Sequence, residues 1–282
     1  MHHYAVMIAR LTLRLGLRVT VNIPGKYVLL IVAFIAYSIM ASSQRPTETT
    51  QALQPEAAQI LALANQARVA AGVPPLQWDG SLAAAARKHC LRMAGEGPLS
   101  HRYPGELDLA ERAGQAGALF SLIEENIAIG PTPSDIHEQW MYSSGHRTNL
   151  LNPAVDRVGI AVVASRGVLY ATADYSRGVQ NLNPAEVEAR VTALIRPRGL
   201  TILRDPQVAR DACLMDRGIP ASAGDSRPIF IMRWQDTELS QLPGSLSAQI
   251  ATGRYHKAAV GSCTSTGTQG TFTAYRIAVL LY

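Results

Sequence analysis

Helical periodicity dominates the chain after residue 54. Over 55–72, Ile60, Leu61, Ala64 and Ala67 recur near a 3.6-residue period, which predicts an amphipathic helix that ends at a glycine. The same signals predict further helices over 81–93, 108–116, 132–143, 185–195 and 206–216. Several helices of this length indicate a globular protein with a substantial helical layer.

Strands with an alternating or continuous apolar pattern lie between these helices. The segments 158–164 and 168–175 flank a Ser-Arg-Gly turn and predict a β-hairpin. Extended segments are expected at 124–129 and 228–234, and the last 26 residues predict two strands around a glycine turn. The Asn-Leu-Asn-Pro sequence at 181–184 breaks the pattern. We therefore expect an α+β fold with a boundary there and a smaller unit over 185–282.

The N-terminal segment 1–43 predicts an export signal or a membrane anchor. Lys26 precedes the run 27–43, which consists of apolar or small residues. Its length is near the lower limit of about 17 residues for a spanning helix, and its small final residues also suit cleavage. A cleaved signal peptide and an uncleaved transmembrane helix stay open. A polar linker, 44–54, follows. Basic residues before the run place the globular part outside the cytoplasm, so a secreted or extracytoplasmic protein is expected.

The charge of the chain is concentrated at its N-terminus. Arg10, Arg14, Arg18 and Lys26 account for most of the net charge of +5, because 1–43 contains no acidic residue. The remaining chain is nearly neutral and lacks the positive field that binds phosphate backbones. We therefore expect no nucleic-acid partner.

Three cysteines, Cys90, Cys213 and Cys263, limit the disulfide pattern. In an exported chain an odd number indicates one bridge and one free thiol, or no bridge. Cys213 and Cys263 are the favoured pair, since both lie in the last hundred residues. Cys90 lies on the apolar face of a predicted helix, which is typical of a buried thiol.

Several motifs occur in a fixed order between residues 55 and 178. They are L-A-N-Q-A-R, L-Q-W-D-G-S-L, S-H-R, E-E-N-I-A, W-M-Y-S-S-G-H-R-T-N-L-L-N-P and V-G-I-A-V-V. This ordered set resembles the CAP superfamily (cysteine-rich secretory proteins, antigen 5 and plant pathogenesis-related class-one proteins), and in particular its bacterial branch. The resemblance implies a CAP domain over 55–180, folded as a three-layer α-β-α sandwich with a cleft.

The resemblance also implies which residues line the cleft. Two histidines and two glutamates face each other there in the family. By motif they correspond to His101, His146 and Glu125, while Ser143 occupies the position of the second glutamate. We expect a helix break at Gly145 to turn His146 into the cleft.

The chemistry of these residues leaves alternatives open. Two imidazoles, His101 and His146, can bind a divalent metal such as zinc if a carboxylate or water completes the shell. Equally, His146 can bond Glu125 as part of the cleft architecture. The first functional hypothesis is a binding module for a lipid, glycan or envelope component. The second is a metal-assisted hydrolase with Glu125 as base. The third is a purely structural extracellular module.

The smaller unit carries weak signs of internal repetition. The similarities are a V-G dipeptide at 158 and 260, an A-R dipeptide three residues before Cys90 and Cys213, and a tryptophan before each hairpin, Trp140 and Trp234. Pairing Asp79 with Asp205 instead shifts the helix alignment by three residues. We expect 185–282 to be either a degenerate CAP-like copy without the cleft residues or an unrelated α+β unit.

Overall fold

The computed structural model describes residues 9–12, 18–21, 53–263 and 272–282. The chain divides into two parts, Met1–Ala52 and Leu53–Tyr282. In the first part, β1 (Ala9–Thr12) pairs antiparallel with β2 (Arg18–Val21). The apolar run 27–43 lies outside the described residues. Among the helices that are described, none has both the length and the apolar character needed to cross a bilayer.

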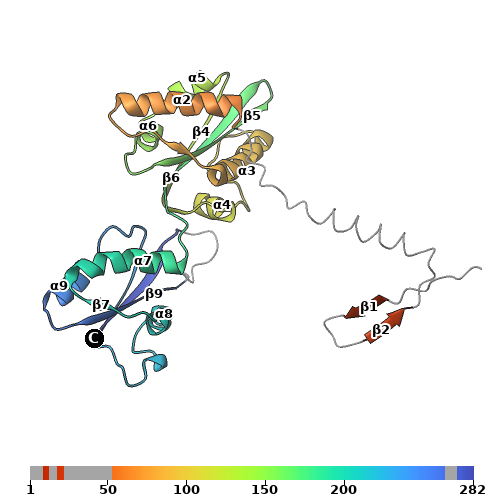
Figure 1. Cartoon of the computed structure of the whole chain (residues 1–282). Helices are drawn as coiled ribbons and strands as arrows, with labels where there is room; N and C mark the ends of the chain where they lie inside the picture. Colours follow the sequence, from red (N-terminus) through yellow and green to blue (C-terminus); the bar gives the residue numbers. More distant parts are fainter. Residues whose placement is uncertain (1–8, 13–17, 22–52, 264–271) are drawn as a thin grey trace, which may run out of the picture. The chain divides into compact units, whose positions relative to one another are not determined.

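The second part begins with a sheet and five helices (Figure 1). Its elements are α2 (Pro55–Ala70), β3 (Gln77–Trp78), α3 (Gly80–Glu96), α4 (Leu109–Gln115), β4 (Phe120–Gly130), α5 (Pro133–Tyr142), α6 (Ser144–Leu150), β5 (Arg157–Ser165) and β6 (Val168–Gly178). The strands lie in the order β3-β5-β6-β4, and all neighbours are antiparallel except β3 and β5. We call residues 55–178 the first unit.

Local sequence signals explain where these elements begin and turn. The Asp79 side chain accepts hydrogen bonds from two backbone N–H groups at the start of α3, and Thr132 caps α5 ahead of Pro133. Arg166 and Gly167 both have positive φ angles, which gives the two-residue turn that suits a β-hairpin. The predicted helix starts and hairpin are thus confirmed.

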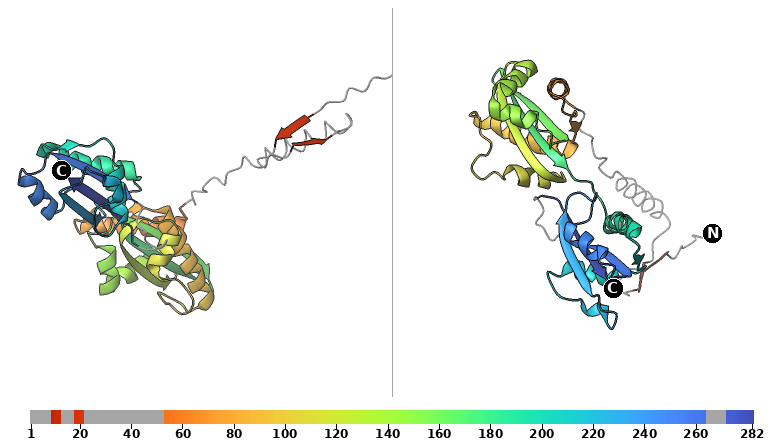
Figure 2. Two further views of the ribbon diagram at one scale, coloured as in Figure 1. Left: turned by 90° about the horizontal axis from the view of Figure 1, so that it is seen from below. Right: turned by 90° about the vertical axis from the view of Figure 1, so that its left-hand side faces the viewer.

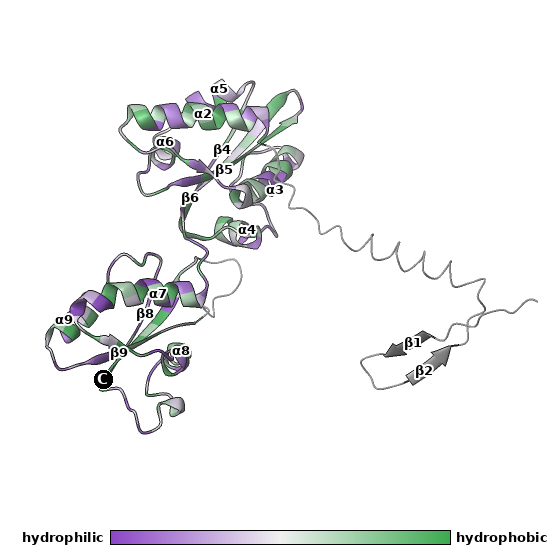
Figure 3. Ribbon diagram, in the orientation of Figure 1, coloured by the Kyte–Doolittle hydropathy of each residue, from purple (hydrophilic) through white to green (hydrophobic). Residues whose placement is uncertain are grey.

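Helices cover both faces of this sheet (Figure 2). On one face, α2, α5 and α6 pack Ile60, Trp140 and Leu150 against Val158 and Ala173. The other face is covered by α3 and α4. Figure 3 shows apolar and polar residues interspersed along α2, whose buried residues are Ala57, Ile60, Ala64 and Arg68. The first unit is therefore the three-layer α-β-α sandwich that the resemblance implied.

The second unit, residues 184–281, has its own sheet and helices. Its elements are α7 (Pro184–Ile195), β7 (Thr201–Ile202), α8 (Gln207–Leu214), β8 (Phe230–Asp236), α9 (Gly244–Ala251), β9 (Lys257–Cys263) and β10 (Tyr275–Leu281), with short 3₁₀ turns at Arg196–Arg198 and Ala221–Ala223. A disulfide joins Cys213 on α8 to Cys263 on β9, as expected. Cys90 is a buried free thiol. The smaller α+β unit is confirmed, although the turn at 264–271 lies outside the described residues.

The two units share one connectivity. The second sheet has the order β7-β9-β10-β8, with β7 and β9 parallel and the other neighbours antiparallel. In each unit a glycine on the sheet lies directly against the backbone of a helix. A Cβ atom on Gly159 would lie 2.0 Å from the backbone of Ala83 in α3, and one on Gly261 would lie 2.2 Å from that of Ala209 in α8. The shared plan supports the hypothesis of a degenerate copy.

Candidate functional site

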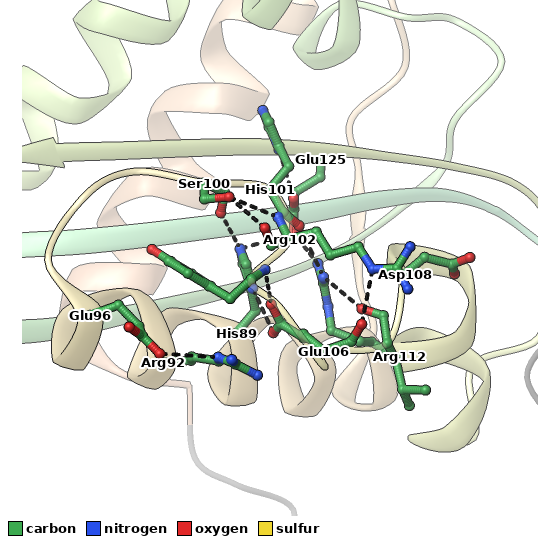
Figure 4. Close-up of polar contacts among 12 residues, drawn as sticks. His89, Arg92, Glu96, Ser100, His101, Arg102, Glu106, Asp108, Arg112 and Glu125 are labelled. Carbon is green, nitrogen blue, oxygen red and sulfur yellow. Dashed lines mark hydrogen bonds and ion pairs between the residues drawn. The ribbon is translucent and has the colours of Figure 1, made fainter.

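Glu125 is the centre of a polar cluster in the first unit (Figure 4). It lies on β4, an edge strand of the sheet, and its side chain is only 3% exposed. One carboxylate oxygen accepts a hydrogen bond from Nδ1 of His101 at 2.8 Å. The other forms an ion pair with the guanidinium of Arg112. A buried carboxylate is stable only when it is paired and hydrogen-bonded in this way.

His101 presents the accessible surface of this cluster. It lies in the loop between α3 and α4, and its side chain is 59% exposed although its Nδ1 atom is bonded to the buried Glu125. That hydrogen bond raises the pKa of His101 above its ordinary value, more than burial lowers it. The imidazole therefore favours its charged form and directs Nε2–H away from Glu125.

Arg112 supplies the charge that balances Glu125. It lies on α4, whose start is fixed by a capping box between Asp108 and Glu111. Its side chain is 4% exposed, and it also donates to the carbonyl oxygen of His101 at 3.2 Å. One side chain thus fixes both the carboxylate and the backbone of the histidine loop.

A second pair, His89 and Glu106, forms hydrogen bonds with the loop that carries His101. Nδ1 of His89 lies 2.8 Å from Oε1 of Glu106, and Nε2 lies 2.9 Å from the carbonyl oxygen of Ser100. Each ring nitrogen of His89 thus lies within hydrogen-bond distance of an oxygen atom. Burial acts to raise the pKa of Glu106, but the bonds from His89 and the Tyr103 N–H group outweigh it and lower the pKa.

Asp174 adds a buried acid beside Glu125. It lies on β6 directly across from Glu125 on β4 and has no exposed surface. Neither carboxyl oxygen has a hydrogen-bond partner among the described residues. Burial, and then the charge of Glu125, raise the pKa of Asp174 well above its usual range. The surroundings of Asp174 therefore favour its neutral form over its charged form.

The short helix α6 brings the remaining predicted residues to the site. The chain turns at Ser143, which is extended and joins α5 to α6. The expected break at Gly145 is wrong, because Gly145 lies inside α6. His146 is half-buried. Burial, and then the charge of His101, lower the pKa of His146. Asn149 fastens α6 to β4 by donating to the carbonyl oxygen of Glu125 at 3.2 Å.

The predicted cleft residues are thus brought together in part. His101 bonds Glu125 directly, and His146 is close enough to His101 for their charges to interact. No group of three or more His, Cys, Asp or Glu side chains able to hold a metal occurs in the described ranges. Nδ1 of His101 is already bonded to Glu125. No step through a metal follows from this geometry.

Sequence reasoning missed four members of the cluster: His89, Glu106, Arg112 and Asp174. Asp174 alone carries a local signal, because it is the acidic residue of β6 and follows a run of apolar and small residues, 168–173. The partners of the other three lie on other elements, so no spacing along the chain reveals them.

The three-layer sandwich of the first unit is the fold expected of a CAP domain. The model of the cysteine-rich secretory protein family (CAP) matches residues 61–175. The uncharacterized protein YkwD of Bacillus subtilis is 30% identical over 132 residues, which cover 45% of this chain and 51% of YkwD. The chain thus spans about half the length of this curated relative.

Solved structures give similar matches. An extracellular protein with an SCP domain from Bacillus anthracis is 30% identical, with a TM-score of 0.40, and the match covers 43% of this chain and 39% of that one. An outer surface protein of Borrelia burgdorferi is 16% identical, with a TM-score of 0.42, and the match covers 44% and 94%. On the family match and the YkwD relative, residues 61–175 belong to the CAP superfamily and are of the bacterial type.

Proposed function

We propose that the first unit is a binding module for a lipid, glycan or other envelope component, and that its cleft holds the ligand. The observation that carries this proposal is the pairing of an exposed imidazole, His101, with a buried carboxylate, Glu125, that is balanced by Arg112. In this arrangement His101 presents Nε2 to solvent in a fixed orientation, and its raised pKa favours the form in which Nε2 donates a hydrogen bond. The ligand group it suits is an oxygen acceptor, such as a sugar hydroxyl, a carboxylate or a phosphate.

Stability alone is a poor reason for such a cluster. Buried ion pairs recover little more than the cost of removing their charges from water, and an apolar replacement is often as stable. Residues with perturbed pKa values that gather at an accessible edge are typical of functional sites. His101 and His146, whose pKa values shift in opposite directions, fit that description.

The proposed place of action is outside the cytoplasm. The disulfide between Cys213 and Cys263 supports it, because such bonds persist mainly in oxidising compartments. The apolar run at 27–43 adds independent support from the sequence.

Calorimetry can test the proposal on residues 53–282. Peptidoglycan fragments and phospholipid vesicles are titrated in separate arms into the wild type, the His101→Ala/His146→Ala variant and the His256→Ala control, whose histidine is exposed in the second unit. We expect one arm to bind the wild type and the control equally and the double variant at least about tenfold more weakly. A further arm with zinc addresses the metal hypothesis.

Two results would contradict the binding proposal. Equal affinity of the double variant and the wild type would show that His101 and His146 take no part in ligand binding. No heat and no thermal stabilisation by either ligand class would leave the first unit as a structural module.

A further inference from the structure

The strand β8 forms one edge of the second sheet, because it pairs with β10 on one side only. Where β9 begins, Lys257 and Tyr282 exchange both backbone hydrogen bonds, at 3.3 and 3.0 Å. Bonding alternates along an antiparallel ladder, so the even-numbered residues of β10 face β9 and its odd-numbered residues face β8. The odd-numbered residues of β10 pair with even-numbered residues of β8. The backbone groups of Ile231, Arg233 and Gln235 therefore point away from the sheet.

The corresponding edge strand of the first unit, β4, is covered by the two helices that follow it. Three side chains of α5 and α6 donate hydrogen bonds to alternate carbonyl oxygens of β4. The bonds run from Asn149 to Glu125 at 3.2 Å, from Trp140 to Ile127 at 3.2 Å and from Gln139 to Ile129 at 3.0 Å. These helices thus occupy the groups to which another strand would pair.

The edge of β8 has no such cover in the part of the chain that the structure describes. One helix, α9, lies between β8 and β9 in the sequence, where the first unit has α5 and α6. It contacts the strand through Ser245, which donates to the sulfur of Met232 at 3.8 Å. Among the described residues, no side chain or loop bonds to the backbone of Ile231, Arg233 or Gln235. An open edge of this kind is a template for an added strand.

The two faces of β8 differ in chemistry, which limits the strand that fits. On one face Phe230, Met232 and Trp234 are only partly buried against the core of the second unit. On the other face Arg233 donates to two carbonyl oxygens, of Ala212 and Gly218, both at 2.6 Å. The edge therefore suits a strand with apolar side chains on one face and a polar one opposite Arg233.

The charge of Arg233 is not balanced by a carboxylate. The charges that act on it are those of Arg276 and Asp216, and Asp216 forms its ion pair with Arg276, at 2.9 Å. Arg233 itself forms no ion pair in the described ranges. A second copy of this chain, paired symmetrically about this residue, would place two arginines opposite each other, which is destabilising. An acidic side chain at that position is favourable.

We propose that β8 binds an extended peptide segment of another protein, which adds antiparallel to the sheet and places an acidic residue opposite Arg233. Alternate residues of the segment bond to the outward backbone groups of β8. Its remaining residues are apolar and cover Met232 and Trp234. The backbone bonds supply affinity and the two faces supply selectivity. This role belongs to the second unit and does not depend on the cleft of the first.

Amide hydrogen exchange, followed by NMR on the isotope-labelled full chain, tests the proposal. The probe is the peptide acetyl-S-V-T-V-E-V-T-V-S-amide, which has Val residues on one face and Glu on the other. Three matched peptides carry Lys in place of Glu, a methyl group on the Glu nitrogen, or a methyl group on the nitrogen of the preceding Val. Two variants, Gln235→Pro and Gln235→Ala, both lose the exposed side chain, but only proline removes the outward N–H group.

We expect the probe to slow the exchange of the Ile231, Arg233 and Gln235 amides. The amides of Met232 and Trp234 already face β10 and should not change. The Lys peptide, the peptide methylated at Glu, and the probe with Gln235→Pro should each bind at least about tenfold more weakly. The peptide methylated at Val, and the probe with Gln235→Ala, should bind as the reference pair does. The spectrum itself reports whether each variant is folded.

Four results would each overturn the proposal. They are equal binding of the Glu and Lys peptides, undiminished binding after methylation at Glu, no protection of the three amides up to about 1 mM probe, and protection of these amides without peptide as the protein concentration rises. The last result would assign the edge to a second copy of this chain.

Discussion

The two units of the folded part build the same sheet but place different side chains at its centre. In the first unit Gly159, Asp174 and Glu125 lie side by side on adjacent strands. In the second unit the corresponding row, aligned on the helix-contacting glycines, is Gly261, Ala278 and Arg233. An acid pair is thus replaced by an alanine and an arginine.

The second unit shows that this backbone plan does not require the charged cluster. Its α8 packs Ala209, Ala212 and Cys213 against Ala259 and Ala278 of the sheet, and a disulfide ties the helix to β9. The equivalent face of the first unit buries carboxylates, a histidine and a guanidinium instead. Because this fold forms without the cluster of carboxylates, histidine and guanidinium, the charges in the first unit are better explained by binding than by stability.

The largest effect is expected from Glu125→Ala. It leaves the buried Arg112 guanidinium without a counter-charge, which should lower the free energy of unfolding by about 3–5 kcal/mol. Arg112→Met with Glu125→Leu removes both charges, so it should recover most of that loss while ligand binding is still lost. Urea unfolding provides the measurement. A double variant no more stable than Glu125→Ala would show that the cluster is structural.

The next effect tests whether the two units share their helix contact. Gly159→Ala and Gly261→Ala each force a Cβ atom into helix backbone and should each cost about 3 kcal/mol of unfolding free energy. Gly80→Ala and Gly244→Ala are controls, since a Cβ atom there meets nothing within 4 Å. Thermal unfolding measures all four variants. If only one of the first two is destabilised, the units do not share this contact.

Removal of the disulfide should have a slightly smaller effect, confined to the second unit. Cys213 and Cys263 are 50 residues apart, and closing a loop of that length stabilises a fold by at least about 2 kcal/mol. Hydrogen exchange of Cys213→Ala/Cys263→Ala should therefore show faster opening in 184–281 than in the first unit. Uniformly faster exchange in both units would contradict their independence.

Asp174→Asn should increase stability, by about 1 kcal/mol at pH 8. The folded-state pKa of Asp174 is raised, so the wild type loses stability as pH rises from the unfolded value near 4 through the folded value. Asparagine stays neutral at every pH. Urea unfolding between pH 4 and 8 should show a gap that widens with pH. Parallel curves would mean that Asp174 is ionised in the fold.

Local signals predicted the parts of this molecule that neighbouring residues determine. Asp79 and Thr132 begin their helices, and the hairpin at 166–167 has the expected turn. In the repeat, the pairing of Asp79 with Asp205 agrees with the structure, because each accepts an N–H group two residues further on. Alignment of the two units on their glycine contacts pairs Arg210 with Ala83, about one helical turn away from the Arg87 of the A-R alignment.

The features that the sequence did not predict depend on packing between segments far apart in the chain. Trp234 on β8 lies opposite Ile277 and so corresponds to Asn126 on β4, not to Trp140 on α5. The helix α9 is only eight residues long and buries two of them, Leu246 and Ile250. Two apolar residues are too few to predict a helix from the sequence. The partners of Arg112 and His89 lie on other elements, so they could not be read from spacing.

The central claim is that Glu125 fixes the exposed imidazole of His101 and raises its pKa. A pH titration of the imidazole NMR signals in the wild type and in Glu125→Gln tests it most directly. We predict a pKa above the ordinary histidine value for His101 and below it for His146 in the wild type, with the His101 pKa falling in Glu125→Gln. An ordinary pKa for His101, unchanged by Glu125→Gln, would contradict the account.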